Sequence, residues 1–234
     1  ALVNSYETKD GYALDELREA EKANYIKDPH YNDNRDPRLR MSIWFPNETF
    51  LDATPNPWLL SGTDGLGRSM STMTGYWVKK WLTERDNGKV AAEAGTLDFF
   101  ILRYAEGLLI YVEALVESGQ WNHADVTKYL NQIRSRAGMP DVDVTRYDSQ
   151  AKMRELVRRE RRVELAFEGQ RLFDIRRWNI AEQVMNTKVY GAVRPGEDTP
   201  VEIETRRFSS RDYYWPIPIG AMHNTSAMVQ NPGW

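Results

Sequence analysis

The sequence predicts a mainly α-helical fold built from tetratricopeptide-like helical hairpins, with long irregular loops and a few short β-strands. Three observations predict it. Residues 96–187 show helical spacing of apolar side chains interrupted by glycines. Residues 1–95 are rich in Pro, Gly, Asn and Asp, which favour turns and loops. Residues 188–234 combine β-type residues with Pro and Gly breaks. We therefore interpret residues 1–234 as one domain with three successive segments.

Within the loop-rich segment, we expect a short helix over residues 15–26. Residues 41–45 and 74–82 have the aromatic and β-branched bias of strands. The long loop between these two strands has the composition of turns. Because a long ordered loop in a compact domain is more often functional than accidental, this loop is the first place to look for ligand contacts.

The helical segment predicts two successive hairpins. Residues 97–119 are apolar almost all round, which predicts a long buried helix. Residues 121–138 follow after a short turn, so the two helices should pack antiparallel. Residues 149–169 and 170–186 suggest a second pair, and two hairpins in succession are typical of a tetratricopeptide-type repeat.

The last segment should be extended. Residues 188–194 and 201–208 carry strand signals. Residues 212–220 do so too, but Pro216 and Pro218 cannot donate to a central ladder, which predicts an edge or a loop there.

Composition excludes several classes of function. A net charge of -3 over 234 residues argues against a nucleic-acid partner, which would call for a basic surface. With no Cys, a disulfide framework and thiolate chemistry are excluded. No metal or cofactor is expected, because His30, His123 and His223 are far apart and form no HExxH motif. Residues 28–36 are rich in oxygen ligands but lack EF-hand spacing, so we interpret them as a polar loop. No apolar run is long enough to span a bilayer, and the first residues do not resemble a signal peptide.

Residues 154–178 carry many opposite charges among apolar side chains. Glu160 and Glu164 share an otherwise apolar helix face at spacing i,i+4, and arginines flank both. A catalytic acid/base pair, a polyanion-binding face and an internal lattice of ion pairs would each explain this pattern. We favour the lattice, because the planar arginine fork suits buried carboxylates and because acids interleave with the bases.

Seven segments, in order, resemble those of one known family. They are YETKDG, NRDPRL, TGYWVKKW, ILRYAEGLLIYVEAL, LNQIRSRAGMP, ELVRRERRVELAFEGQRLFDIRRW and the ending YYWPIPIGAM with VQNPGW. The chain thereby resembles the SusD/RagB family, nutrient-binding outer-membrane lipoproteins of Bacteroidetes. It departs from the family pattern at Gly107 and at 220–221. It also lacks the family's N-terminal region with its lipidated Cys, so we interpret it as the C-terminal part of such a protein.

The resemblance implies a non-catalytic protein of the outer surface of the cell outer membrane. Such a protein binds oligosaccharide or another nutrient, delivers it to a SusC-like TonB-dependent transporter and is anchored through a lipidated N-terminus absent from this chain. It also implies that the charged block is a scaffold, because members with different ligands share it. The expected structural ion-pair network comprises Glu160, Arg161, Arg162, Glu164, Glu168, Arg171, Asp174 and Arg176.

Local chemistry, not a family motif, suggests the ligand-binding residues. Sugars pack their C–H faces on aromatic rings and need polar partners for their hydroxyls. The candidates are Trp44, Trp58, Asn56, Asp64 and Arg68. Trp58 is the first choice, because it sits in a Pro- and Asn-rich loop. The other tryptophans are expected to pack in the core or in the helical scaffold; they include Trp77, Trp81, Trp121 and Trp178.

Two alternatives stay open at this point. A glycan-processing hydrolase would need two free carboxylates flanking the scissile bond. A helical-repeat scaffold that binds a protein or peptide would need no sugar site. The sequence does not name the ligand.

Overall fold

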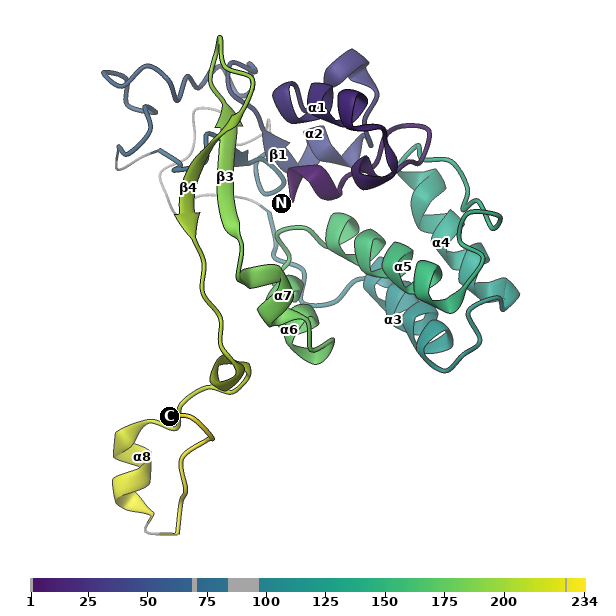
Figure 1. The fold of residues 1–234 in the computed structure, drawn as a ribbon, viewed down its shortest axis with the longest axis vertical. Coiled ribbons are helices and arrows are strands. Elements are labelled where there is room, and N and C mark those ends of the chain that lie inside the picture. The colour runs from purple at the N-terminus through teal and green to yellow at the C-terminus, as the bar shows by residue number, and fades with distance from the viewer. Residues whose placement is uncertain (1, 69–70, 84–96, 226) are drawn as a thin grey trace.

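The fold is described from a computed structural model, which places residues 2–68, 71–83, 97–225 and 227–234. Helices form one half of the molecule, and a long β-hairpin runs beside them (Figure 1). The C-terminal end, including α8 (Ile219–Asn224), extends away from the helices. The chain is mainly helical with few short strands, which confirms the predicted fold class.

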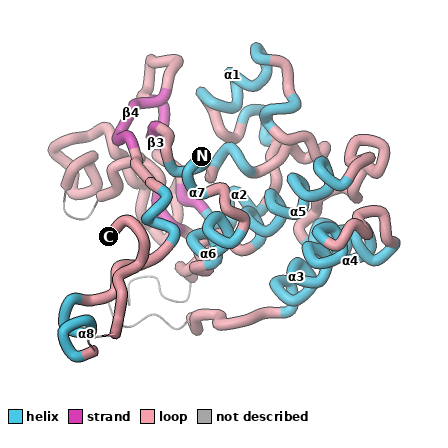
Figure 2. Tube along the Cα trace, turned by 60° about the horizontal axis from the view of Figure 1, so that its bottom comes forward, coloured by secondary structure: helices cyan, strands magenta, loops and turns pink. Residues whose placement is uncertain are grey.

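The largest core lies among three helices: α3 (Tyr104–Glu117), α4 (Ala124–Arg136) and α5 (Gln150–Glu164). Helix α3 packs against both others, and α3 and α4 lie side by side in Figures 1 and 2. Apolar residues at helical spacing drive this packing, because one face of each helix must be removed from water. Its fully buried members include Leu109, Val112, Leu130, Met153, Leu156 and Val157.

Helix α3 begins seven residues later than the sequence predicted. Residues 97–103 are not helical, and Arg103 is the N-cap with extended backbone angles of φ -138° and ψ 162°. The Arg103 guanidinium reaches carboxylates at the end of α5, and this contact outweighs the local helical pattern. The prediction of burial is wrong for this stretch, since Ile101 is 89% exposed.

The two helices predicted to form the second hairpin each pack on another helix instead. Helix α5 packs on α3, whereas α6 (Gln170–Arg177) packs on α7 (Ala181–Met185). Between α5 and α6 the chain reverses through two left-handed residues, Phe167 at φ 62° and Gly169 at φ 80°. Glycine adopts that conformation without steric cost, which explains why one stands immediately before α6.

The N-terminal region forms a second, smaller core against the end of α5. Helix α1 (Glu19–Lys27) is followed by α2 (Arg38–Ser42), which leads directly into β1 (Ile43–Trp44). Strand β1 pairs antiparallel with β2 (Trp77–Val78). Both strands are shorter than the ranges 41–45 and 74–82 that the sequence predicted. The helix expected over residues 15–26 begins at Glu19, as α1. The second core holds Val3, Tyr6, Leu39, Ile43, Phe45 and Val163.

The C-terminal region begins with an antiparallel hairpin of β3 (Lys188–Val193) and β4 (Pro200–Thr205). The hairpin is fixed to the N-terminal region where the Ala192 amide donates to the Thr74 carbonyl at 2.7 Å. Residues 214–218 are a loop, as the prolines predicted, but α8 follows where extended chain was expected. Short 3-10 helices occupy Val3–Ser5, Leu14–Glu16, Tyr31–Asp33 and Ser210–Tyr213.

Across the ranges placed in the structure, no helix combines the length and the apolar character needed to cross a bilayer.

Candidate functional site: an aromatic cavity beside the β-hairpin

A cavity of about 380 Å³ lies between the N-terminal loops and the β3–β4 hairpin. This volume falls within the range of sites that hold small molecules. Five separate segments supply its wall: the end of α1 with the residues after it, the residues after β1, the loop around Trp58, the residue before β2 and the tip of the hairpin. The side chains most able to contact a ligand are His30, Phe45, Asn47, Trp58, Tyr76, Arg194 and Glu197.

Trp58 is held in place by its own loop. Its backbone amide donates to Asn56 Oδ1 at 3.1 Å. The backbone amide of Asn56 donates in turn to Asp64 Oδ2 at 2.5 Å. The indole ring lies against Gly75, where an added Cβ would be 3.7 Å from the ring edge. Gly75 has φ +76°, so the loop requires a glycine there for conformation as well as for space. The Trp58 side chain is half-buried and lines the cavity.

The polar candidates from the sequence serve the loop around Trp58. Arg68 donates from Nε and Nη2 to the Leu60 carbonyl at 3.0 and 2.8 Å. Asn56 and Asp64 form the chain of hydrogen bonds that orients Trp58. None of these three side chains lines the cavity, and their hydrogen bonds lie within the loop that carries Trp58.

Trp44 lies outside the cavity, and its neighbour Phe45 lines it. Trp44 Nε1 donates to the Glu48 carbonyl at 2.7 Å, and its ring packs edge-on against Phe50. Successive side chains of an extended chain point to opposite faces, so Trp44 and Phe45 cannot both face the same cavity. The alternation of side-chain direction along the predicted strand 41–45 was the signal that could have selected Phe45 instead of Trp44.

His30 contributes a polar atom to the aromatic wall. Its ring contacts Phe45 edge-to-face, with 4.1 Å between centroids. Its Nε2 is buried and has no hydrogen-bond partner among the described residues. Burial, with the nearby charge of Arg40, lowers the pKa of His30 to about 4. The imidazole is therefore neutral at neutral pH, and one of its nitrogens has no partner within the described residues. Nothing in the sequence pattern indicated this role.

The tip of the β3–β4 hairpin forms one wall of the cavity. Lys27, at the end of α1, forms an ion pair with Asp198 between the two strands. Arg194 and Glu197 line the cavity, and Arg194 Nη1 lies 3.9 Å from Glu197 Oε1. The site thus offers ring faces from Trp58 and Phe45 together with charged donors and acceptors, a combination that suits a polyhydroxylated ligand.

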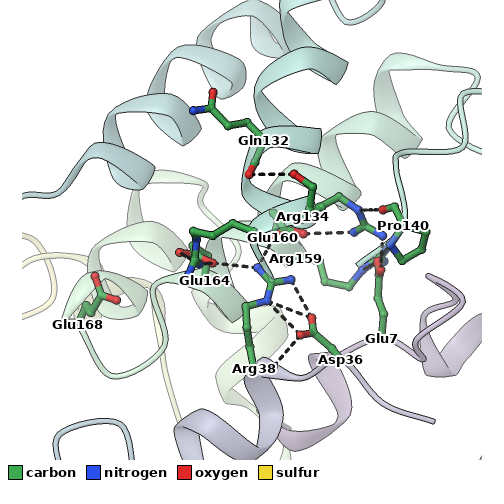
Figure 3. Close-up of polar contacts among 12 residues, drawn as sticks. Glu7, Asp36, Arg38, Gln132, Arg134, Pro140, Arg159, Glu160, Glu164 and Glu168 are labelled. Atoms are coloured by element: carbon green, nitrogen blue, oxygen red, sulfur yellow. Dashed lines mark hydrogen bonds and ion pairs between the residues drawn. The ribbon is translucent and has the colours of Figure 1, made fainter. Parts of the chain in front are cut away.

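The charged block of α5 forms a separate, buried cluster (Figure 3). Arg38 contacts both Glu160 and Glu164, and the distance from Arg38 Nη1 to Glu164 Oε2 is 2.9 Å. Arg134 Nη1 lies 3.3 Å from Glu160 Oε2. Arg103 joins the end of the same cluster at 2.8 Å from Glu164 and 2.7 Å from Glu168.

The bases in this cluster come from other elements. The flanking arginines of α5 point elsewhere: Arg158 pairs with Glu117, and Arg159 pairs with Glu7. Arg161 bonds Asp174 at 3.1 Å. Within the part of the chain that the structure describes, no carboxylate lies within 4.0 Å of the other expected bases, Arg162, Arg171 and Arg176. Arg176 instead donates to the Asp212 carbonyl at 3.0 Å and lies over the Trp215 ring.

The glutamates of this cluster are saturated by arginine. Burial raises the pKa of Glu164, but the hydrogen bonds and charges of Arg103 and Arg38 outweigh burial and hold that pKa below its ordinary value. Glu164 is therefore a permanent anion with both oxygens engaged, and such a carboxylate is unsuited to shuttle protons.

The oxygen-rich stretch over 28–36 is also engaged internally. Asp36 accepts from Arg38 at 2.7 Å, and Asp33 pairs with Arg40 at 2.9 Å. No group of three His, Asp or Glu side chains among the described residues could hold a metal ion.

Comparison with known proteins assigns the whole chain to one family. The model of the SusD family matches residues 1–234. A SusD-like protein from Bacteroides fragilis has a solved structure with 31% identity and a TM-score of 0.80, covering 100% of this chain and 46% of that one. A SusD-like carbohydrate binding protein from the same organism also has 31% identity, with a TM-score of 0.77, covering 95% and 46%. SusD-like protein P2 of Formosa agariphila is 29% identical over 63% of this chain and 28% of its own length.

The fold and these matches define a helical, tetratricopeptide-like protein. The chain belongs to the SusD family, which confirms the resemblance seen in the sequence. It spans less than half the length of these relatives.

Proposed function

We propose that this chain contributes a glycan-binding site, and that the ligand packs a sugar ring on Trp58 in the cavity beside the β-hairpin. The observation that carries the proposal is that Trp58 and Phe45 line a cavity together with His30, whose neutral ring has a buried, unpartnered nitrogen. A protein core normally satisfies such a nitrogen, so its lack of a partner next to aromatic rings supports a ligand with hydroxyl groups. The carbohydrate binding of a B. fragilis relative supports the same class of ligand.

The proposed role is non-catalytic. The acidic pair most suggestive of hydrolysis, Glu160 and Glu164, is buried and bound by arginines. A retaining or inverting glycosidase needs one carboxyl group that can donate a proton and one that is free. Prolonged incubation with glycans should therefore release no reducing sugar, and a steady release would contradict this part of the proposal.

The test is a glycan-array screen of the chain followed by titration calorimetry with the best ligand. Trp58→Ala should weaken binding by about tenfold or more, equivalent to ~1.4 kcal/mol, because the sugar loses its ring contact. Trp215→Ala is the matched control, because Trp215 is 67% exposed and lies outside the cavity. Unchanged affinity in Trp58→Ala, or equal losses in both variants, would overturn the proposed site.

We further propose that the full-length protein delivers the ligand to a SusC-like TonB-dependent transporter on the outer surface of the outer membrane, held there by a lipid anchor. Membership of the SusD family supports this role. The test is co-purification of the transporter with the full-length protein from outer membranes, together with protease accessibility on whole cells. Absence of a transporter from the purified material would contradict the delivery role.

A further inference from the structure

A second cavity, of about 370 Å³, lies where α5 turns into α6. It shares no lining residue with the cavity at Trp58. Its wall combines apolar side chains with guanidinium groups and the first residues of α6. The residues that matter to the argument are Arg161, Arg162, Leu165, Phe167, Gly169 and Arg171.

Two of its arginines lack counter-ions. No carboxylate lies within 4.0 Å of Arg162 or of Arg171 in the described ranges. Burial, with the positive charge of Arg171, lowers the pKa of Arg162 to about 10. Burial also lowers the pKa of Arg171, and Asp174 only partly offsets it. Two half-buried cations that lack an anion are costly, and an anion between them would remove that cost.

A third arginine that lines the same cavity has an unpartnered nitrogen. Arg161 is 3% exposed, and its Nη1 is buried with no hydrogen-bond partner among the described residues. Its other nitrogens bond Asp174, with Nη2 at 3.1 Å from Oδ1. Asp174 also lines the cavity, but Arg177 contacts it at 2.7 Å as well, so its charge is already matched and does not repel an entering anion.

The start of α6 adds donors from the backbone. Gly169 is the N-cap of this eight-residue helix, and no side chain caps it. The first amides of an α-helix have no partner within the helix, and the helix dipole favours negative charge at this end. Gly169, Gln170 and Arg171 line the cavity, which places this helix end beside the arginines.

We propose that this second cavity binds a small molecule that carries a carboxylate, of the size of a hexuronate. The guanidinium fork pairs with a carboxylate through two parallel hydrogen bonds. Leu165, Phe167 and Leu172 give the cavity apolar walls, which suit the carbon skeleton of an organic acid better than a bare inorganic ion. The proposal does not rest on glycan binding at Trp58.

The test is titration of the chain with D-glucuronate by calorimetry and by amide NMR, with D-glucose as the neutral match. Glucuronate should bind and shift the amides of Gly169 to Arg171, and glucose should do neither. Arg162→Gln and Arg171→Gln should each weaken glucuronate binding by about tenfold or more. Arg207→Gln removes the same charge from an exposed position outside the cavity and should leave the affinity unchanged.

Folding and the source of the carboxylate are controlled separately. Circular dichroism checks that each variant is folded, and Arg162→Lys, which keeps the charge but loses the fork, should bind with intermediate affinity. Equal binding of glucose, or glucuronate binding that survives both glutamine substitutions, would overturn the proposal. Tighter binding of the peptide acetyl-Gly-Glu-Gly-amide than of glucuronate would also overturn it, because the cavity would then take an acidic side chain of a protein segment.

Discussion

Arg38 in α2 and Glu164 in α5 lie 126 residues apart in the sequence, and yet Arg38 Nη1 is 2.9 Å from Glu164 Oε2 in the interior. The same nitrogen also bonds Glu160 one turn earlier. Burial lowers the pKa of Arg38, but Glu160 and Asp36 outweigh burial and hold that pKa above its ordinary value. One cation thus joins the N-terminal region to the helical core.

Removing the carboxylate of Glu160 should destabilise the protein strongly. Glu160→Ala would leave Arg38 and Arg134 buried without their shared partner, and such a loss typically costs about 3–5 kcal/mol. Glu155→Ala is the matched control, because it makes the same change at an exposed position of the same helix. Urea denaturation measures both, and a wild-type midpoint for Glu160→Ala would refute a structural role for this contact.

His30 should make stability depend on pH below 6.5. Its pKa falls to about 4 in the folded state from an ordinary value of 6.5, so the unfolded chain binds more protons between these values. Stability contributed by the neutral ring is therefore present above pH 6.5 and is lost as the pH falls to about 4. After allowance for solvent screening of a half-buried ring, we expect a loss of about 1–3 kcal/mol.

The pH prediction is checked by urea denaturation of wild type and His30→Gln between pH 4 and pH 8. The stability difference between the two proteins should change between pH 4 and pH 6.5 and be constant above pH 6.5. The NMR signal that disappears in His30→Gln should titrate near pH 4 in the wild type. A midpoint near 6.5 for that signal would show that the ring is not buried as described.

Gly191 should tolerate no side chain. An added Cβ would lie 2.8 Å from the Thr74 carbonyl oxygen, so Gly191→Ala must move the β-hairpin away from the wall of the aromatic cavity. We expect a loss of about 1–3 kcal/mol and weaker glycan binding. Gly107→Ala is the contrasting variant: it has no neighbour within 4 Å and lies inside α3, so it should stabilise the chain by about 0.5–1 kcal/mol. Equal melting temperatures for the two variants would contradict the close approach at Gly191.

The sequence predicted those features that depend on local pattern. Helical spacing of apolar residues identified α3, α4 and α5, because an amphipathic stretch can be stable only with one face buried. The prolines at 216 and 218 placed a loop, because proline has no amide to donate. The order of the seven motifs identified the family, which the match over residues 1–234 confirmed.

Only the tertiary structure decided which residues meet. Arg38 and Arg134 reach Glu160 from distant elements, so the arginines next to it in the sequence were poor guides to its partners. The aromatic cavity likewise gathers His30, Phe45 and Trp58 from separate loops, which no local spacing encodes. Short-range pattern fixes how a segment buries its own face, whereas contacts across the chain depend on how those faces pack against each other.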